Sequence, residues 1–169
     1  MSLYEFTVPQ LKTNLQALDK WLDAAVAFAE SKKFDPNTLL SARLAPDQFP
    51  LVRQIQSTCD QAKLTCARLT GKTPPVHPDT EETIDQLRTR IRAVVEYLDT
   101  FTRGDFADSE ARKISLPWFQ GKHLLGIDYL NQQQLPNFYF HFSHAYAILR
   151  HNGVPLGKAD FITALNLRD

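Results

Sequence analysis

His141 is the residue of this sequence best suited to chemistry, because it interrupts an otherwise apolar helical stripe. Phe138, His141, Ala145 and Ile148 follow one another at steps of three, four and three residues, the spacing of one helix face. A buried imidazole needs a hydrogen-bond partner for each ring nitrogen. Three roles therefore stay open for His141: a core histidine bonded to a carbonyl or hydroxyl, a pocket residue facing a ligand, or a metal ligand.

Three further polar residues are candidates for the same pocket. His144 lies three residues after His141 and shares its face or sits at the edge of it. Gln48 lies one step before the apolar stripe of the second helix, where it can face the bundle end; a capping or surface role is the alternative. Asn137 precedes His141 by one helical turn. We predict a candidate pocket formed by His141, Gln48, Asn137 and His144, with no catalytic role assigned to any of them.

Stronger chemical signatures are missing from the sequence. It contains no HExxH, CxxC, glycine-rich phosphate loop or GxSxG motif, so we predict no metal and no cofactor. Cys59 and Cys66 are seven residues apart on one predicted helix, a rise of about 10.5 Å, which is too far for a disulfide. They are interpreted as small buried apolar side chains.

Composition limits the class of protein. The chain has 169 residues, 43% of them hydrophobic and 22% charged, which predicts one globular domain over residues 1–169. Nineteen basic and nineteen acidic residues give a net charge of zero, which argues against nucleic acid or anionic membranes as partners. No apolar stretch is long enough for a membrane span. The first residues do not resemble a signal peptide and two thiols are unpaired, which predicts a cytoplasmic protein.

Four helical segments would position these residues. Apolar periodicity predicts helices over 9–33, 47–69 and 135–152, and a third helix capped by Asp79 or Thr80 with an apolar stripe from Ile84 to Phe101. The proline-rich stretch 72–78 should be extended. Residues 104–134 lose the helical period, and within them 113–118 and 123–126 predict a small β-hairpin. Trp118 at its tip would cover an open bundle end or anchor a partner. The fold class is all-α, a four-helix bundle.

A family resemblance supports this fold. The runs 135–141 and 145–161, together with 42–47 and Leu116-Pro117-Trp118, resemble a bacterial family of uncharacterised proteins with a DinB-like four-helix bundle. The resemblance implies an up-down-down-up helix order with a crossover between helices two and three. By itself the linker favours a simple antiparallel return, but about nine extended residues reach about 30 Å. We therefore expect the crossover.

The wider DinB-like superfamily implies a metal site that this sequence does not reproduce. Many members bind a divalent metal with three histidines, one on helix two and an HxxxH pair on helix four, and some are thiol-dependent transferases or isomerases. His141 matches the first position of the pair, the second falls on Ala145, and the helix-two position falls near Gln48. Neither alanine nor glutamine is a usual ligand for a transition metal, so we expect no metal here.

Three hypotheses of function follow. The first is an uncharacterised DinB-like protein that binds a small molecule without metal, in a pocket between helices two and four covered by the hairpin. The second is a thiol-dependent transferase or isomerase that uses His141 as ligand or general base. The third is an interaction module that forms a homodimer through its helix faces.

Overall fold

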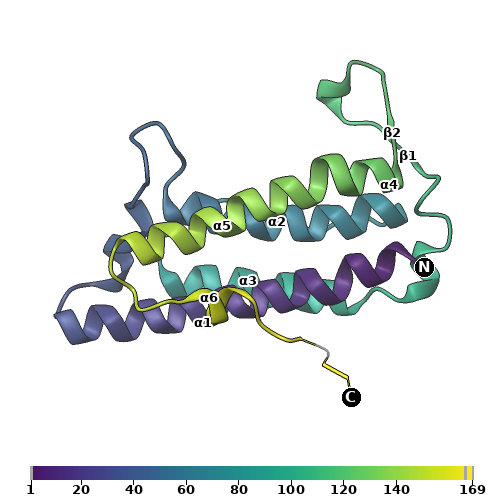
Figure 1. The fold of residues 1–169 in the computed structure, drawn as a ribbon. Helices are drawn as coiled ribbons and strands as arrows, with labels where there is room; N and C mark the ends of the chain where they lie inside the picture. Colours follow the sequence, from purple (N-terminus) through teal and green to yellow (C-terminus); the bar gives the residue numbers. More distant parts are fainter. Residues whose placement is uncertain (1, 166, 169) are drawn as a thin grey trace.

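Four long helices run along one axis and form the body of the protein (Figure 1). The computed structural model describes residues 2–165 and 167–168. The long helices are α1 (Val8–Lys32), α2 (Leu51–Thr70), α3 (Ile84–Asp99) and α5 (Leu135–His151). In Figure 1, α1 and α5 run in one direction and α2 and α3 in the other. The predicted all-α bundle with up-down-down-up order is confirmed.

Short elements connect and extend these helices. They are the 3-10 helices Leu3–Phe6, Pro36–Ser41, Arg103–Phe106 and Pro117–Phe119, the strands β1 (Lys113–Ile114) and β2 (Leu124–Leu125), the short helices α4 (Gly126–Asp128) and α6 (Lys158–Phe161), and a π-helix over Tyr129–Gln134.

The linker between α2 and α3 crosses the length of the bundle. Lys72, just after α2, pairs with Asp105, just after α3, at 2.8 Å, so these two helices end at the same end of the bundle. Arg53 in the first turn of α2 pairs with Asp79 at the opposite end, shortly before α3 begins. A segment rich in proline suits this connection because proline favours extended backbone. The crossover expected from the family resemblance is therefore present.

The C-terminal part of the chain docks on the bundle through aromatic side chains. Trp21 of α1 is buried, and its indole Nε1 donates a hydrogen bond to the backbone oxygen of Asp160 at 2.9 Å. The ring of Phe161 lies 5.7 Å from the ring of Trp21 and 4.9 Å from that of Phe142. These contacts fix α6 between α1 and α5.

Two helix starts differ from the sequence expectation. The second helix begins at Leu51 and not at residue 47, because Pro50 adopts an extended conformation at its N-cap. The third helix begins at Ile84, where the hydroxyl of Thr83 accepts a hydrogen bond from the backbone N–H of Gln86 and forms a capping box. The predicted cap at Asp79 or Thr80 was wrong, because Thr83 and Gln86 satisfy the free backbone groups.

The expectation that residues 104–134 are not helical was also wrong for residues 126–134. α4 and the π-helix lead without a break into α5. The polar run that hides the helical period is used inside the fold, since Gln134 is buried and its Nε2 donates to the hydroxyl of Thr65 at 3.0 Å. Gly126 starts this segment at a close approach to the backbone, where a Cβ atom would lie 1.8 Å from the carbonyl oxygen of Ser109.

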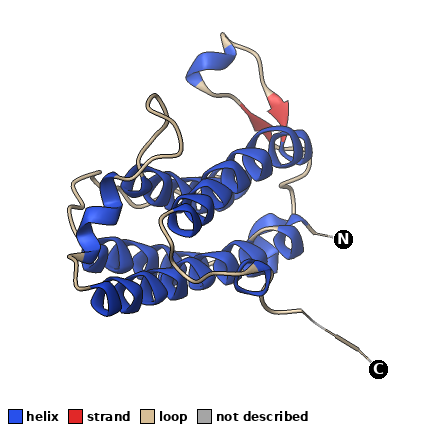
Figure 2. Cartoon of the chain, turned by 60° about the vertical axis from the view of Figure 1, so that its left-hand side comes forward, coloured by secondary structure: helices blue, strands red, loops and turns tan. Residues whose placement is uncertain are grey.

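The predicted hairpin is present, and its base packs on the core through Ile114 and Leu116, but its tip projects away from the helices (Figure 2). β1 and β2 pair antiparallel, with Lys113 opposite Leu125. Figure 2 shows the hairpin projecting away from the helices, and Trp118 near its tip is 60% exposed. The expectation that Trp118 covers a bundle end was therefore wrong. As expected, no helix within the described ranges is long and apolar enough to cross a membrane.

Candidate functional site

His141 lies in α5 and faces α2 from a nearly buried position. Its side chain is 8% exposed, and its Nδ1 lies 2.8 Å from Oε1 of Gln54 on α2. The Gln54 side chain is fully buried. A histidine from one helix and a glutamine from its antiparallel neighbour thus form one polar contact in an apolar interface.

The hydrogen bond between Gln54 and the Phe49 carbonyl fixes the tautomer of His141. The side-chain Nε2 of Gln54 donates to the backbone carbonyl of Phe49 at 3.3 Å, and a carbonyl can only accept. The oxygen Oε1 of Gln54 therefore faces His141, so Nδ1 of the imidazole must carry the proton. The other ring nitrogen, Nε2, keeps a free lone pair, and it has no hydrogen-bond partner among the described residues.

Burial keeps this imidazole neutral. Removal from water, together with the nearby side chains of His144 and Arg53, lowers the pKa of His141 from 6.5 to about 4. At neutral pH the ring is therefore uncharged. It can accept a hydrogen bond at Nε2, but it cannot attract an anion by charge.

Two half-exposed aromatic rings flank His141. The ring of Phe49, which precedes α2, stacks on the imidazole with centroids 6.4 Å apart and planes at 12°. The ring of Phe140 meets it edge-on at 5.2 Å. These two phenylalanines are 49% and 50% exposed. Water can reach the site between two apolar walls, which suits an aromatic or apolar molecule with one hydrogen-bond donor.

The structure brings two of the four predicted pocket residues together. His144 is half-buried beside His141; its ring lies 4.1 Å from Phe140, and its Nδ1 donates to the Phe140 carbonyl. Asn137 is half-buried one turn before His141, and Gln48 lies in the turn before α2 with a buried side-chain oxygen that has no partner in the described part of the chain. Neither forms a hydrogen bond with His141, and their pocket role stays a prediction.

Sequence reasoning missed two neighbours of His141, namely Gln54 and Phe49. A signal for Gln54 existed, because Gln54, Thr58, Gln61 and Thr65 are polar residues at steps of four, three and four on α2. Three of them are buried, and this stripe faces α5. The hairpin expected over this pocket lies elsewhere, and the segment that contacts His141 is the one before α2.

The residues around His141 do not fit the three-histidine metal site of the superfamily. On α5 the position one turn after His141 is the apolar Ala145, and on α2 the facing residue is Gln54, whose amide is already engaged at both ends. No group of three or more histidine, cysteine, aspartate or glutamate side chains able to hold a metal occurs in the residues that the structure describes. One imidazole nitrogen alone is a poor metal site.

A second polar cluster holds the crossover linker in place. Arg90 of α3 is buried, and its guanidinium pairs with Asp60 at 2.7 Å, with Asp79 at 2.9 Å and with Glu81 at 3.1 Å. Asp60 belongs to α2, while the other two carboxylates belong to the linker. Because every charge faces an opposite charge, we interpret this cluster as structural.

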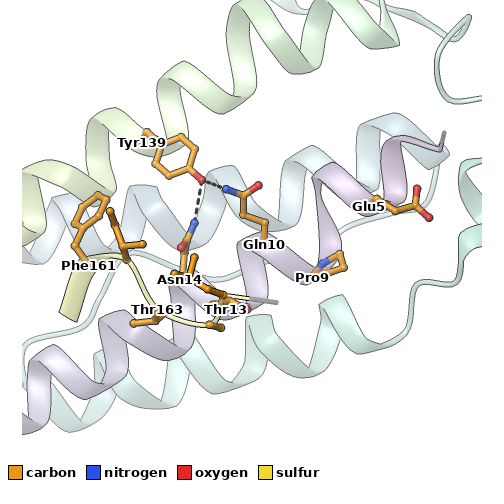
Figure 3. Close-up of a pocket in the computed structure, with 11 residues that line it drawn as sticks. Glu5, Pro9, Gln10, Thr13, Asn14, Tyr139, Phe161 and Thr163 are labelled. Carbon is orange, nitrogen blue, oxygen red and sulfur yellow. Dashed lines mark hydrogen bonds between the residues drawn. The ribbon is translucent and has the colours of Figure 1, made fainter. Parts of the chain in front are cut away.

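A cavity of about 550 Å³ lies on the other side of α5 (Figure 3). It is bounded by α1, by Tyr139 of α5 and by residues 161–165 after α6. None of the four predicted pocket residues lines it.

The four long helices and their up-down-down-up order define a DinB-like four-helix bundle, with His141 of α5 facing α2. A crystal structure described as a DinB family member protein from Shewanella denitrificans is similar to the chain, with 47% identity and a TM-score of 0.96, over 99% of this chain and 95% of that one. The model of a family called Domain of unknown function (DUF1993) matches residues 3–162. The chain belongs to this family. No functionally curated relative matches it.

Proposed function

We propose that this protein binds a small organic molecule at His141 without a metal ion. The observation that carries the proposal is the free Nε2 lone pair of a neutral imidazole that Gln54 holds in one tautomer. Water can reach Nε2, so a ligand that donates a hydrogen bond to it would replace that water and keep the acceptor paired. The rings of Phe49 and Phe140 would contact the apolar part of that ligand.

The enzymatic alternative is less well supported by the same geometry. A general base for a thiol should have a pKa near the working pH, and a free thiol has a pKa of about 8.5. Burial instead lowers the pKa of His141 to about 4, so the imidazole is a weak base. Its best use is as a hydrogen-bond acceptor.

Metal analysis of the purified protein tests the metal-free part of the proposal. We expect no stoichiometric zinc or nickel, and addition of zinc should leave the NMR signals of His141 unchanged. Stoichiometric metal with histidine coordination would contradict the proposal and favour the transferase hypothesis.

Indole and 1-methylindole test the ligand-binding part, because they differ in a single N–H donor. Indole should shift the His141 imidazole signals in a saturable way, and 1-methylindole should bind several-fold more weakly, the loss expected for about one hydrogen bond. The variant His141→Leu should bind both compounds equally. Equal binding of both compounds to the unchanged protein would contradict a donor-specific site at Nε2.

The hairpin favours a homodimer as a second candidate function. Trp118, Leu125 and Ile127 on or beside it are large apolar side chains exposed by 60%, 41% and 37%, and such side chains are common in protein interfaces. Sedimentation at micromolar concentration should show a dimer that Trp118→Ser weakens. A strict monomer in the unchanged protein would contradict this candidate.

A further inference from the structure

The cavity between α1, α5 and the C-terminal segment is distinct from the His141 site. Tyr139 and His141 are two residues apart on α5 and therefore point to nearly opposite sides of the helix. The hydroxyl of Tyr139 contacts α1, whereas His141 contacts α2. Figure 3 shows Tyr139 above Gln10 and Asn14 of α1, with the C-terminal segment passing below them.

Several hydrogen-bonding groups around Tyr139 are left free to bind a ligand. The Tyr139 oxygen accepts from the side-chain amides of both Gln10 and Asn14, the latter at 3.3 Å. Its own O–H has no acceptor among the described residues. Because both amide nitrogens point to Tyr139, their oxygens point away from it, and those oxygens also have no partner in the described ranges. Around Tyr139 the cavity therefore presents one phenol donor and two amide acceptors, and the hydroxyls of Thr13 and Thr163, which can both donate and accept, line it as well.

Glu5 adds a negative charge to the same cavity. It lines the end beyond Pro9, as Figure 3 shows. Its Oε1 forms an ion pair with the guanidinium of the exposed Arg103 at 2.5 Å, and both of its carboxylate oxygens are shielded from water without a hydrogen-bond partner among the described residues. A shielded carboxylate oxygen is stabilised by an N–H donor or a positive charge. Glu5 is the one charged side chain among the described residues that line this cavity, so the lining charge is negative.

The remaining wall is apolar. Pro9 and Phe161 line the cavity together with Ile162 and Leu165. The last two are 49% and 67% exposed, so a ligand would cover apolar surface that water now contacts. A volume of about 550 Å³ is within the usual range of small-molecule sites.

We propose that this cavity is a second ligand site, for a small primary amine in its ammonium form with an apolar body. The ammonium group donates to the free oxygens of Glu5, Gln10 or Asn14, and the apolar body lies against Phe161 and Ile162. This assignment does not depend on the function proposed for His141.

Titration with three probes of equal chain length tests this assignment. n-Hexylammonium, n-hexanol and hexanoate are added separately at pH 7, and the ¹⁵N-labelled side-chain amides of Gln10 and Asn14 are followed by NMR. Hexylammonium should shift these amides in a saturable way and bind more tightly than hexanol, with hexanoate weakest. Equal or tighter binding of hexanol or hexanoate, or the lack of a saturable shift at these amides, would overturn the proposal.

Two matched variants distinguish an effect of Glu5 inside the cavity from a general effect of the protein's net charge. Glu5→Gln should weaken hexylammonium binding by roughly three- to fivefold, the range of a partly exposed ion pair, and leave hexanol binding unchanged. Glu30→Gln makes the same chemical change at an exposed position of α1 and should change neither. Equal effects of the two variants would contradict the role of Glu5. If Glu5→Gln does not fold, the ranking of the three probes on the unchanged protein still decides the proposal.

Discussion

Replacing Arg90 by methionine should destabilise the fold more than any comparable change at a surface arginine. Methionine retains most of the apolar volume of the arginine side chain but removes six hydrogen bonds, which now reach five partners: Asp60, Asp79, Glu81 and the backbone oxygens of Gln56 and Pro78. Three carboxylates then lose their shared cation. The linker loses the contact that ties it to α2 and α3.

The expected cost follows from how deeply each partner is buried. Breaking a fully buried ion pair costs about 3–5 kcal/mol. The Arg90 side chain is 1% exposed, but its three carboxylate partners keep 12–35% exposure, so water can partly replace the lost cation. We therefore expect Arg90→Met to lower the free energy of unfolding by roughly 2–4 kcal/mol.

Urea denaturation at pH 7 measures this cost, and Arg88→Met is the matched control. Arg88 also belongs to α3 and pairs with Asp19 and Asp23 at 2.9 and 2.7 Å, but its side chain is 20% exposed and that of Asp23 is 56% exposed. The control should lose about 1 kcal/mol or less. Equal losses for the two variants would refute the conclusion that the Arg90 cluster holds the crossover.

Three further results are expected. Gly126→Ala should lower the free energy of unfolding in urea by about 3 kcal/mol, the upper range of overpacking, because its Cβ would lie 1.8 Å from a backbone oxygen. The control Gly104→Ala meets only an ordinary contact and should change stability little. Equal stability of the two variants would contradict the close approach at Gly126. Cys59 and Cys66, whose pKa values burial raises to about 12, should react with a thiol reagent only at the rate of unfolding, and fast labelling of the folded protein would contradict this. The unfolded chain takes up a proton at His141 near pH 6.5 but the folded chain only near pH 4. Stability should therefore fall as pH falls through this window, and less so in His141→Gln; identical pH profiles would show that the pKa of His141 is not lowered.

Apolar periodicity predicted the four helices because burial of one face determines where a helix packs. His141 was found by the same means, as the one polar side chain on an apolar stripe. The start of α2 and the helical turns before α5 were not found, because Pro50 and the polar residues up to Gln134 hide the period. The relative direction of α2 and α3 was harder to predict. The linker alone favoured an antiparallel return, and only the family resemblance implied the crossover.

The partners of the site were not predictable residue by residue. Gln54 belongs to a polar stripe on α2, and such a stripe looks like a solvent-exposed face until the packing of α5 on α2 is known. Phe49 lies outside any periodic segment. Nothing in the sequence pointed to Arg90, because its carboxylate partners come from another helix and from the linker. In each case the missing information was which other segment of the chain packs against the residue. The periodicity of a single helix does not contain that information.

The central claim is that His141 is a neutral imidazole with its proton on Nδ1 and a free Nε2. Two-bond ¹H–¹⁵N NMR at pH 7, assigned with His141→Gln, measures this directly. We expect a protonated Nδ1, an unprotonated Nε2, and no change of state until the pH falls toward 4. A proton on Nε2, a charged ring at pH 7 or the signature of a metal-bound nitrogen would contradict the account.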